Sequence, residues 1–258
     1  MKNTRLGVEL TKFLLLMALG MASLAVVFLR VHTDNYFVKG DRVEASYYSL
    51  AVFDNSGDIL FSTSPLNDYY YNYQVKDHLQ DKLSSSNNGG IREDLLQTLS
   101  SLFLNKRSLS WNTNGVNSIG KVSANYTASP TSAGLEITRE IKFEKNAPAS
   151  IGEAVKVCSD CLVADDKNRA YFNGNALTKS NIDLASRLNR TPLVLRSEQY
   201  FPSDASKILF IKPDGTVILE IPVAGAQVFW EEDWQLLVFK YPVKTNSRIV
   251  MKQDIYIK

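Results

Sequence analysis

Two cysteines, Cys158 and Cys161, are the side chains whose type and spacing suggest chemistry most directly. In an oxidising compartment two thiols this close form a local disulfide, which would here bridge a turn between adjacent strands. Free or intermolecular thiols and a redox role are the alternatives. A redox site of the thioredoxin type has its second cysteine at a helix start, whereas residues 162–166, LVADD, indicate a strand and a turn. A zinc site would need a second pair of ligands, which the sequence does not offer.

Two tryptophans and three acids stand together in residues 230–234, WEEDW. Two carboxylates beside an aromatic platform could serve a glycosidase, and tryptophans alone could stack on a sugar ring. Adjacent acids on one turn rarely converge on a single bond, so we expect a solvated hairpin tip flanked by inward-packing tryptophans. Trp230 and Trp234 are nevertheless candidate ligand-binding residues.

A run of aromatic residues in the first third of the chain, residues 68–73 (DYYYNY), supplies two more candidates. Tyr70 and Tyr71 would contribute to a surface for a glycan or a protein partner, together with the tryptophans, including Trp111. Tyrosines half-buried at the edge of a fold are the plainer interpretation of the same run.

Composition limits what else the chain can do. Of its 29 basic and 27 acidic side chains, three and one lie in residues 1–29, so the remainder carries no net charge. Nucleic-acid binding requires a basic excess, and we therefore exclude nucleic acid as a partner. Only two histidines occur, and there is no nucleophile elbow, phosphate loop or supported Ser-His-Asp spacing. We predict no catalytic residue, no metal site and no cofactor.

The elements that must position these side chains begin with an uncharged run, Phe13–Leu29, between Lys12 and Arg30. A helix of this length rises roughly 26 Å, close to a hydrocarbon core of about 30 Å. We predict one transmembrane signal-anchor helix over residues 13–30. Basic residues in the tail 1–12 place that tail in the cytoplasm and the rest of the chain outside the cell membrane. A cleaved signal peptide is the alternative, yet no small-residue cleavage site follows the run.

Beyond the anchor we expect an exported region that is α+β or mainly β. It would divide into a β-hairpin with helices over residues 31–107, a polar linker or loop over 108–132 and an antiparallel β domain over 133–258. The clearest strand is residues 135–143, where apolar and charged residues alternate with period two. The antiparallel strands would form either a β-sandwich or an open sheet, with two or three short helices.

Apolar spacing and turn residues predict the individual elements. Helices are expected over residues 75–83, 91–105 and 180–189, the last beginning at a cap formed by Ser180. Residues 31–45 are expected to be a polar connector. Strands are expected at residues 47–53, 59–62, 121–127, 135–143, 154–157, 162–164, 169–172, 207–212, 216–221, 227–230, 234–241 and 248–258.

These features predict a single-pass membrane protein whose extracytoplasmic region binds or scaffolds components of a cell-envelope assembly. We expect its partners to be the membrane, through one helix, and other envelope proteins or glycans. A carbohydrate-binding or carbohydrate-active ectodomain is the alternative hypothesis, because the clustered aromatic residues suit sugars. A thiol-disulfide factor is a third hypothesis, which depends on the two cysteines.

Overall fold

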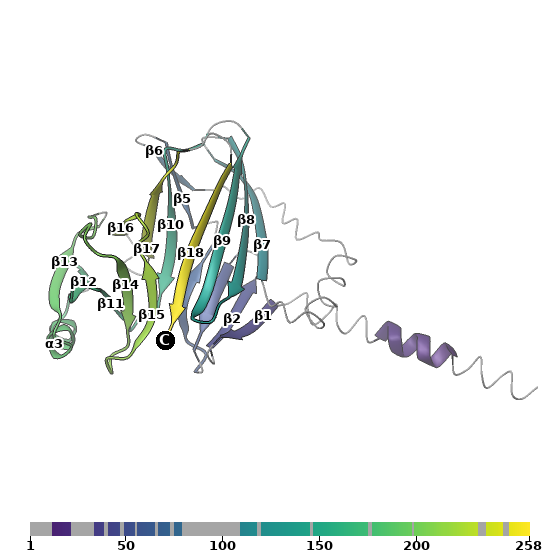
Figure 1. The fold of residues 1–258 in the computed structure, drawn as a ribbon, viewed down its shortest axis with the longest axis horizontal. Coiled ribbons are helices and arrows are strands. Elements are labelled where there is room, and N and C mark those ends of the chain that lie inside the picture. The colour runs from purple at the N-terminus through teal and green to yellow at the C-terminus, as the bar shows by residue number, and fades with distance from the viewer. Residues whose placement is uncertain are drawn as a thin grey trace, which may run out of the picture. The chain divides into compact units, whose positions relative to one another are not determined.

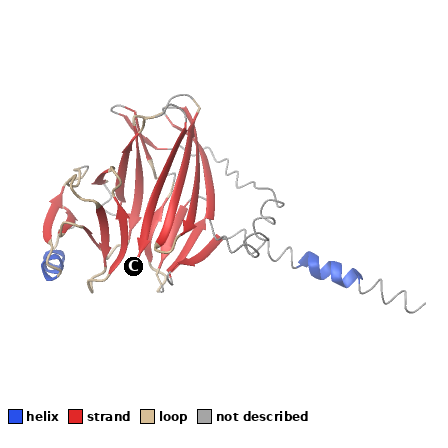
Figure 2. Ribbon diagram, in the orientation of Figure 1, coloured by secondary structure: helices blue, strands red, loops and turns tan. Residues whose placement is uncertain are grey.

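The computed structural model describes residues 12–21, 34–38, 41–46, 49–54, 56–64, 67–72, 75–78, 109–117, 120–144, 147–174, 177–197, 199–231, 236–244 and 248–258. The chain forms two units, one of residues 1–34 and 88–106 and one of residues 35–87 and 107–258. In the first unit the described part is the helix 12–21 and the first residue of strand β1. The second unit is mainly β-structure, drawn red in Figure 2.

The helix 12–21 covers the first part of the predicted membrane anchor. All its residues are exposed, and its large apolar side chains range from 51% exposed at Met17 to 69% at Leu16. Within the described residues, no helix is both long and apolar enough to cross a membrane. Residues 22–30 of the predicted anchor and the predicted helix 91–105 lie outside the described part.

One sheet, sheet A, has nine strands in the spatial order β1-β2-β3-β4-β10-β17-β16, with β5 pairing β10 and β6 pairing β5. Strand β10 is its centre, because it pairs with β17 on one side and with both β4 and β5 on the other. The strands are β1 (Asp34–Val38), β2 (Asp41–Ser46), β3 (Ser49–Phe53), β4 (Ile59–Thr63), β5 (Tyr69–Asn72), β6 (Val75–His78), β10 (Ser150–Val157), β16 (Gln227–Trp230) and β17 (Leu236–Pro242).

The other sheet, sheet B, also has nine strands, in the order β13-β12-β11-β14-β15-β18-β9-β8-β7. Figure 1 shows β7, β8, β9 and β18 side by side, with β18 in yellow. Its strands pair antiparallel except for β12 and β13, which are parallel. They are β7 (Leu109–Asn117), β8 (Gly120–Pro130), β9 (Gly134–Phe143), β11 (Leu162–Asp165), β12 (Arg169–Asn173), β13 (Thr191–Leu195), β14 (Lys207–Ile211), β15 (Val217–Pro222) and β18 (Arg248–Ile257).

The inner faces of the two sheets share one hydrophobic core. Strand β9 shows how the sequence produces it: Leu135, Ile137, Arg139 and Ile141 are buried, and the residues that alternate with them, Glu136, Thr138 and Glu140, are partly exposed. Successive side chains of a strand point to opposite faces, so the predicted alternation buries one face. Each large apolar side chain removed from water stabilises the fold by about 1.5–3 kcal/mol.

The described helix of the second unit, α3 (Lys179–Arg187), connects the parallel strands β12 and β13. Its cap is Thr178, whose hydroxyl accepts the N–H of Asn181 at 3.3 Å, and not Ser180 as predicted. The helix therefore starts earlier than predicted, and it buries Ala185 against a separate apolar cluster on β11, β12 and β14.

Several predicted β-hairpins are confirmed. Strands β3 and β4 pair across the acidic turn at Asp54, and β14 and β15 pair across the turn that contains Gly215. Gly215 has φ +93°, a backbone conformation that would be strained for a residue with a side chain. Strands β16 and β17 pair on either side of the acidic tip, as expected. The mainly β, largely antiparallel character of the chain is thus as predicted.

Three local predictions are wrong. Residues 75–78, taken as the start of a helix, form β6, because the tyrosine-rich β5 offers a strand to pair with. The stretch 108–132 was predicted as loop apart from the strand 121–127; that strand is present within β8, but residues 109–117 form β7 and pair with it. The predicted connector 31–45 contains β1 and most of β2. Neighbouring strands provide hydrogen-bond partners for the backbone of these polar segments. Local sequence patterns do not reveal which segments find such a partner.

Candidate functional site

The predicted ligand-binding aromatic residues that the structure describes lie on two different faces of sheet A. Trp230 and Tyr70 are each 1% exposed and belong to the core between the sheets. Trp230 packs edge-on against Phe201, with 5.9 Å between ring centroids. Tyr71 is partly exposed and packs on the opposite, outer face of sheet A, because neighbours in a strand alternate. Trp234 lies outside the described residues.

Cys158 and Cys161 form a disulfide, as predicted. Their Cα atoms are 5.3 Å apart, and the two residues are 5% and 8% exposed. Cys158 follows β10 of sheet A and Cys161 precedes β11 of sheet B, so the bridge lies where the chain passes between sheets. Thiol exchange needs an accessible sulfur. This burial therefore suits a structural bridge better than a redox site.

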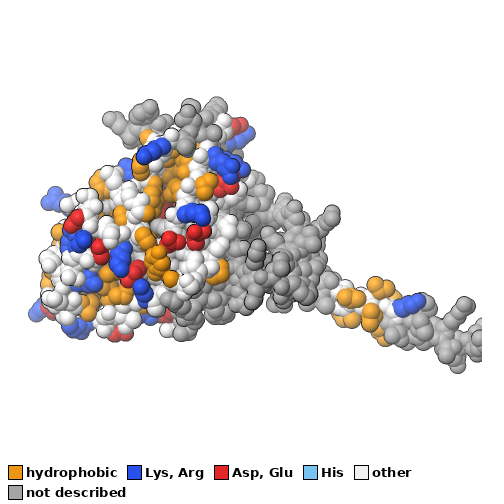
Figure 3. Space-filling view, viewed as in Figure 1, with side chains coloured by type: hydrophobic (Ala, Val, Ile, Leu, Met, Phe, Trp, Pro, Cys, Tyr) orange, Lys and Arg blue, Asp and Glu red, His pale blue; other side chains and the backbone are white. Residues whose placement is uncertain are grey.

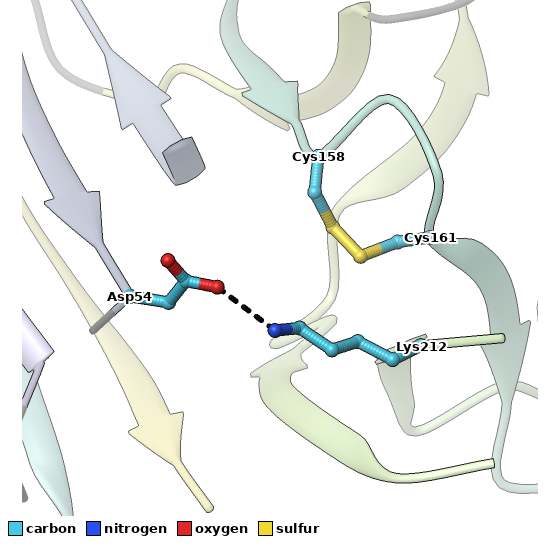
Figure 4. Close-up of a disulfide and its surroundings, with 4 residues drawn as sticks. All are labelled: Asp54, Cys158, Cys161 and Lys212. Carbon is cyan, nitrogen blue, oxygen red and sulfur yellow. Dashed lines mark hydrogen bonds and ion pairs between the residues drawn. A yellow bond between two sulfur atoms is a disulfide. The ribbon is translucent and has the colours of Figure 1, made fainter. Parts of the chain in front are cut away.

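An ion pair lies beside the disulfide (Figure 4), between Lys212 directly after β14 and Asp54 in the turn after β3. Lys212 Nζ is 2.8 Å from Asp54 Oδ2, and Asp54 Oδ1 accepts the backbone N–H groups of Ser56 and Asp58. The pKa of Asp54 is lowered to about 2, chiefly by the hydrogen bond from Lys212. The pair connects sheet A to sheet B at this corner.

The same corner contains potential metal ligands. Within the described residues, Cys158, Asp160 and Cys161 bring their ligand atoms within 4.8 Å of one another. A metal binds cysteine as the thiolate, and here the two sulfurs are bonded to each other. Of this group, only the carboxylate of Asp160 is left to bind, while a structural zinc site takes four ligands. Disulfide formation and metal binding at this corner exclude each other.

The core contains polar side chains that the sequence patterns did not predict. Arg139 on β9 and Glu153 on β10 form an ion pair between the two sheets, with side chains 1% and 0% exposed. Arg139 Nη2 also donates to Gln253 Oε1 on β18 at 3.3 Å. Asp68, directly before β5, accepts the Tyr126 hydroxyl and, at 3.3 Å, a backbone N–H of β10. We call Asp68, Tyr126, Arg139, Glu153 and Gln253 the buried ionic cluster.

Burial controls the protonation of this cluster. It raises the pKa of Asp68 to about 6, because lost hydration outweighs the attraction of Arg139 and the hydrogen bonds that Asp68 accepts. Burial likewise raises the pKa of the Tyr126 hydroxyl well above its usual value. Within the described residues, Arg139 Nε and Nη1 and Glu153 Oε2 have no hydrogen-bond partner. The ion pair is thus the main compensation for burying these two charges.

The buried ionic cluster is closed to substrates. No member is more than 4% exposed, and general acid–base catalysis requires contact with a reacting molecule. We assign it the structural role of fixing the position of one sheet against the other. One signal in the sequence points to it: Arg139 occupies an apolar position of the β9 alternation, where a charge must find a partner.

A second cluster lies on the outer face of sheet A. The strand register places Gly152 of β10 opposite both Lys240 of β17 and Tyr69 of β5. The Tyr71 ring lies across Gly152, where an added Cβ would be 2.9 Å from Tyr71 Cε2. Lys240 Nζ is 4.2 Å from the centroid of the Tyr71 ring and 3.3 Å from the Tyr200 hydroxyl. We call Tyr69, Tyr71, Lys76, Tyr200, Phe229 and Lys240 the aromatic–lysine face.

The two lysines of the aromatic–lysine face differ in their partners. Lys76 Nζ lies 4.2 Å over the Tyr69 ring and 2.5 Å from Glu231, which neutralises it. Lys240 contacts aromatic groups instead, and no carboxylate of the described residues lies within ion-pair distance of it. Tyr200 is 44% exposed and packs edge-on against the buried Phe229. The face therefore offers a solvent-accessible ring beside a cation.

The outer face of β9 and β18 is different in kind. Its charges pair across the strands, Glu136 with Lys252 at 3.2 Å and Glu140 with Arg248 at 3.1 Å. Basic and acidic side chains are likewise interspersed on the face that Figure 3 shows. Such exposed pairs contribute little to stability, and we interpret them as an ordinary solvated surface.

Comparisons with known proteins add little to this geometry. No protein-family model matches the chain, and no curated protein matches it. Among solved structures, the 4-alpha-glucanotransferase from Thermococcus litoralis aligns with 89% of this chain at 8% identity and a TM-score of 0.38. The chain spans 40% of the length of that enzyme. A similarity this distant supports no conclusion about this chain.

Proposed function

We propose that this chain is a single-pass membrane protein whose extracytoplasmic domain, a β-sandwich of the two sheets, binds or scaffolds components of a cell-envelope assembly. The membrane assignment depends on the helix 12–21, whose large apolar side chains are all at least 51% exposed. A helix of a globular protein buries one apolar stripe. A helix that exposes apolar side chains all round favours lipid over water.

The orientation is supported by charge and by sulfur chemistry. Lys2, Arg5 and Lys12 precede the apolar run, and basic residues favour the cytoplasmic side. The Cys158–Cys161 bridge belongs to the other side of the run, and disulfides persist in oxidising compartments. Both features favour an extracytoplasmic second unit.

The assignment to binding is supported by where the ionisable groups lie. The buried ionic cluster has no access to solvent, and the pair Asp54–Lys212 serves as a contact between sheets. The aromatic–lysine face, by contrast, presents Tyr200 and Lys240 at the surface. Aromatic rings with polar tips are typical of recognition surfaces.

Membrane topology tests the proposal. Membranes from cells that produce the full-length protein would be washed with alkaline carbonate, and intact cells would be treated with an added protease. We expect the protein to stay in the washed membranes and its second unit to be cleaved from outside. A variant with Leu16→Arg and Leu19→Arg should move to the soluble fraction, because each arginine costs about 2.5–3.5 kcal/mol at a helix centre. Wild-type protein in the soluble fraction would refute the anchor.

A further inference from the structure

We propose that the aromatic–lysine face binds an acidic saccharide, a sugar ring that carries a carboxylate. Tyr71, Lys240 and Tyr200 would form the site. This inference rests on the proposed function, because it names the ligand class of the extracytoplasmic domain.

The first step concerns the hydrogen-bond donors. The Tyr200 hydroxyl accepts a hydrogen bond from Lys240 Nζ at 3.3 Å. A hydroxyl that accepts still has its own proton to donate, and an ammonium has three. Lys240 and Tyr200 can therefore each direct one donor at the same ligand. Two donors this close match the two oxygens of one carboxylate.

The second step concerns charge. Lys240 has no carboxylate of the described residues within ion-pair distance, whereas Lys76 on the same face is paired with Glu231. The Tyr71 ring, 4.2 Å from Lys240 Nζ, attracts the ammonium but does not neutralise it. An anionic group is the complement that this position favours.

The third step concerns shape. Gly152 lets the Tyr71 ring lie against the sheet, since a Cβ there would be 2.9 Å from Tyr71 Cε2 and 2.8 Å from Val238 Cγ1. Tyr200 stands beside it with 44% of its surface exposed. A sugar ring can stack on an exposed aromatic side chain such as that of Tyr200 while the carboxylate of the sugar binds Lys240. A stable protein partner would instead need about 800 Å² from each side, far more than these few side chains provide.

Calorimetric titration of the full-length protein in detergent micelles tests the site. The probe is trigalacturonic acid, and its control is the same trisaccharide with the carboxylates as methyl esters. We expect the acid to bind at least about tenfold more tightly than the ester, and binding to weaken as salt is added. Equal affinity for acid and ester, or no binding of the acid, would overturn the proposal.

Three variants locate the binding. Lys240→Gln and Tyr200→Phe should each weaken binding of the acid by about tenfold. Lys156→Gln removes an exposed lysine from the same outer face of β10, away from the site, and should leave binding unchanged. Thermal unfolding of each variant checks the fold, and Tyr200→Phe keeps the test valid if Lys240→Gln is unstable. Unchanged binding in a folded Lys240→Gln or Tyr200→Phe variant would refute the site.

Inorganic phosphate and acetate distinguish an acidic sugar from a bare anion. If either displaces trigalacturonic acid at the concentration of the sugar itself, the face is a simple anion site and the saccharide assignment fails. The topology assays above do not involve this ligand. A failed titration with an intact membrane topology would therefore reject the ligand class and leave the anchored binding protein standing.

Discussion

The buried carboxyl group of Asp68 makes the stability of the fold depend on pH. Its pKa is about 6 in the folded protein, against an ordinary 3.8. Because the folded state holds the proton more firmly, the stability from this protonation is fully present below pH 3.8. It is lost as the pH rises through 6, a change of about 3 kcal/mol.

Replacing Asp68 by Asn should remove this dependence. We expect the unfolding free energy of Asp68→Asn to gain about 2.4 kcal/mol relative to the wild type between pH 4 and pH 7. Urea unfolding across that range measures it. Asp58→Asn, at an exposed position of the turn after β3, should keep the wild-type pH profile. If the unfolding free energy of Asp68→Asn varied with pH in parallel with that of the wild type, the raised pKa of Asp68 would be contradicted.

Arg139 and Glu153 should behave as a unit. Arg139→Met leaves Glu153 buried without its partner and should cost about 3–5 kcal/mol. The double variant Arg139→Met/Glu153→Met removes both charges and should recover most of that loss. A double-mutant cycle by urea unfolding measures the coupling. Additive losses would show that the two side chains do not compensate each other in the folded protein.

The candidate site could be predicted only in part from single residues. The tyrosine run attracted attention, but a shift of one residue exchanges the faces of a strand. The sequence therefore could not say that Tyr70 points into the core and Tyr71 away from it. Tyr200 and Lys240 come from segments far apart along the chain, and only the sheet register joins them with Tyr71. The disulfide needed no such register, because its cysteines are neighbours.

Among the elements, β9 and β18 approach each other closely at Gly134. An added Cβ there would be 2.0 Å from the backbone oxygen of Ile255. Backbone in a paired strand cannot move aside cheaply, so Gly134→Ala should cost more than about 2 kcal/mol. At Gly174 the nearest atom would be 3.7 Å away, and Gly174→Ala should be tolerated. Thermal unfolding compares the two, and equal melting temperatures would contradict the close approach.

The disulfide between β10 and β11 should matter less than its position suggests. A ring closed over three residues of separation restricts the unfolded chain little, and its loss should cost about 2 kcal/mol or less. Urea unfolding of Cys158→Ser/Cys161→Ser gives the value, and wild-type protein under reductant should match it. Failure of the double variant to fold would show that the bridge has a larger role.

Predictability differed among elements for a physical reason. Strands with alternating or continuous apolar residues, such as β9 and β14, were evident because burial dictates their composition. Strand β7 includes Asn112, Asn114 and Gly115, residue types that are depleted in strands. It forms because β8 satisfies its backbone, and this partner is visible only in the fold.

For the whole molecule, all strands beyond the first residue of β1 belong to one unit that excludes the N-terminal helix. A chain lacking residues 1–30 should therefore still fold into a β-rich domain with a cooperative unfolding transition. Far-ultraviolet circular dichroism and a urea titration check this. A random-coil spectrum would show that the segment 1–30 is needed for folding.

Strand β10 has a further consequence, which concerns the order in which the chain is made. Strands β1 to β5 precede β10, and the whole hairpin series β7, β8 and β9 is synthesised in between. Until β10 emerges, β4 and β5 lack the neighbour that later completes their backbone hydrogen bonds. The nascent chain therefore carries open strand edges, which are prone to aggregation. We expect a folding chaperone to be needed most during this interval of synthesis.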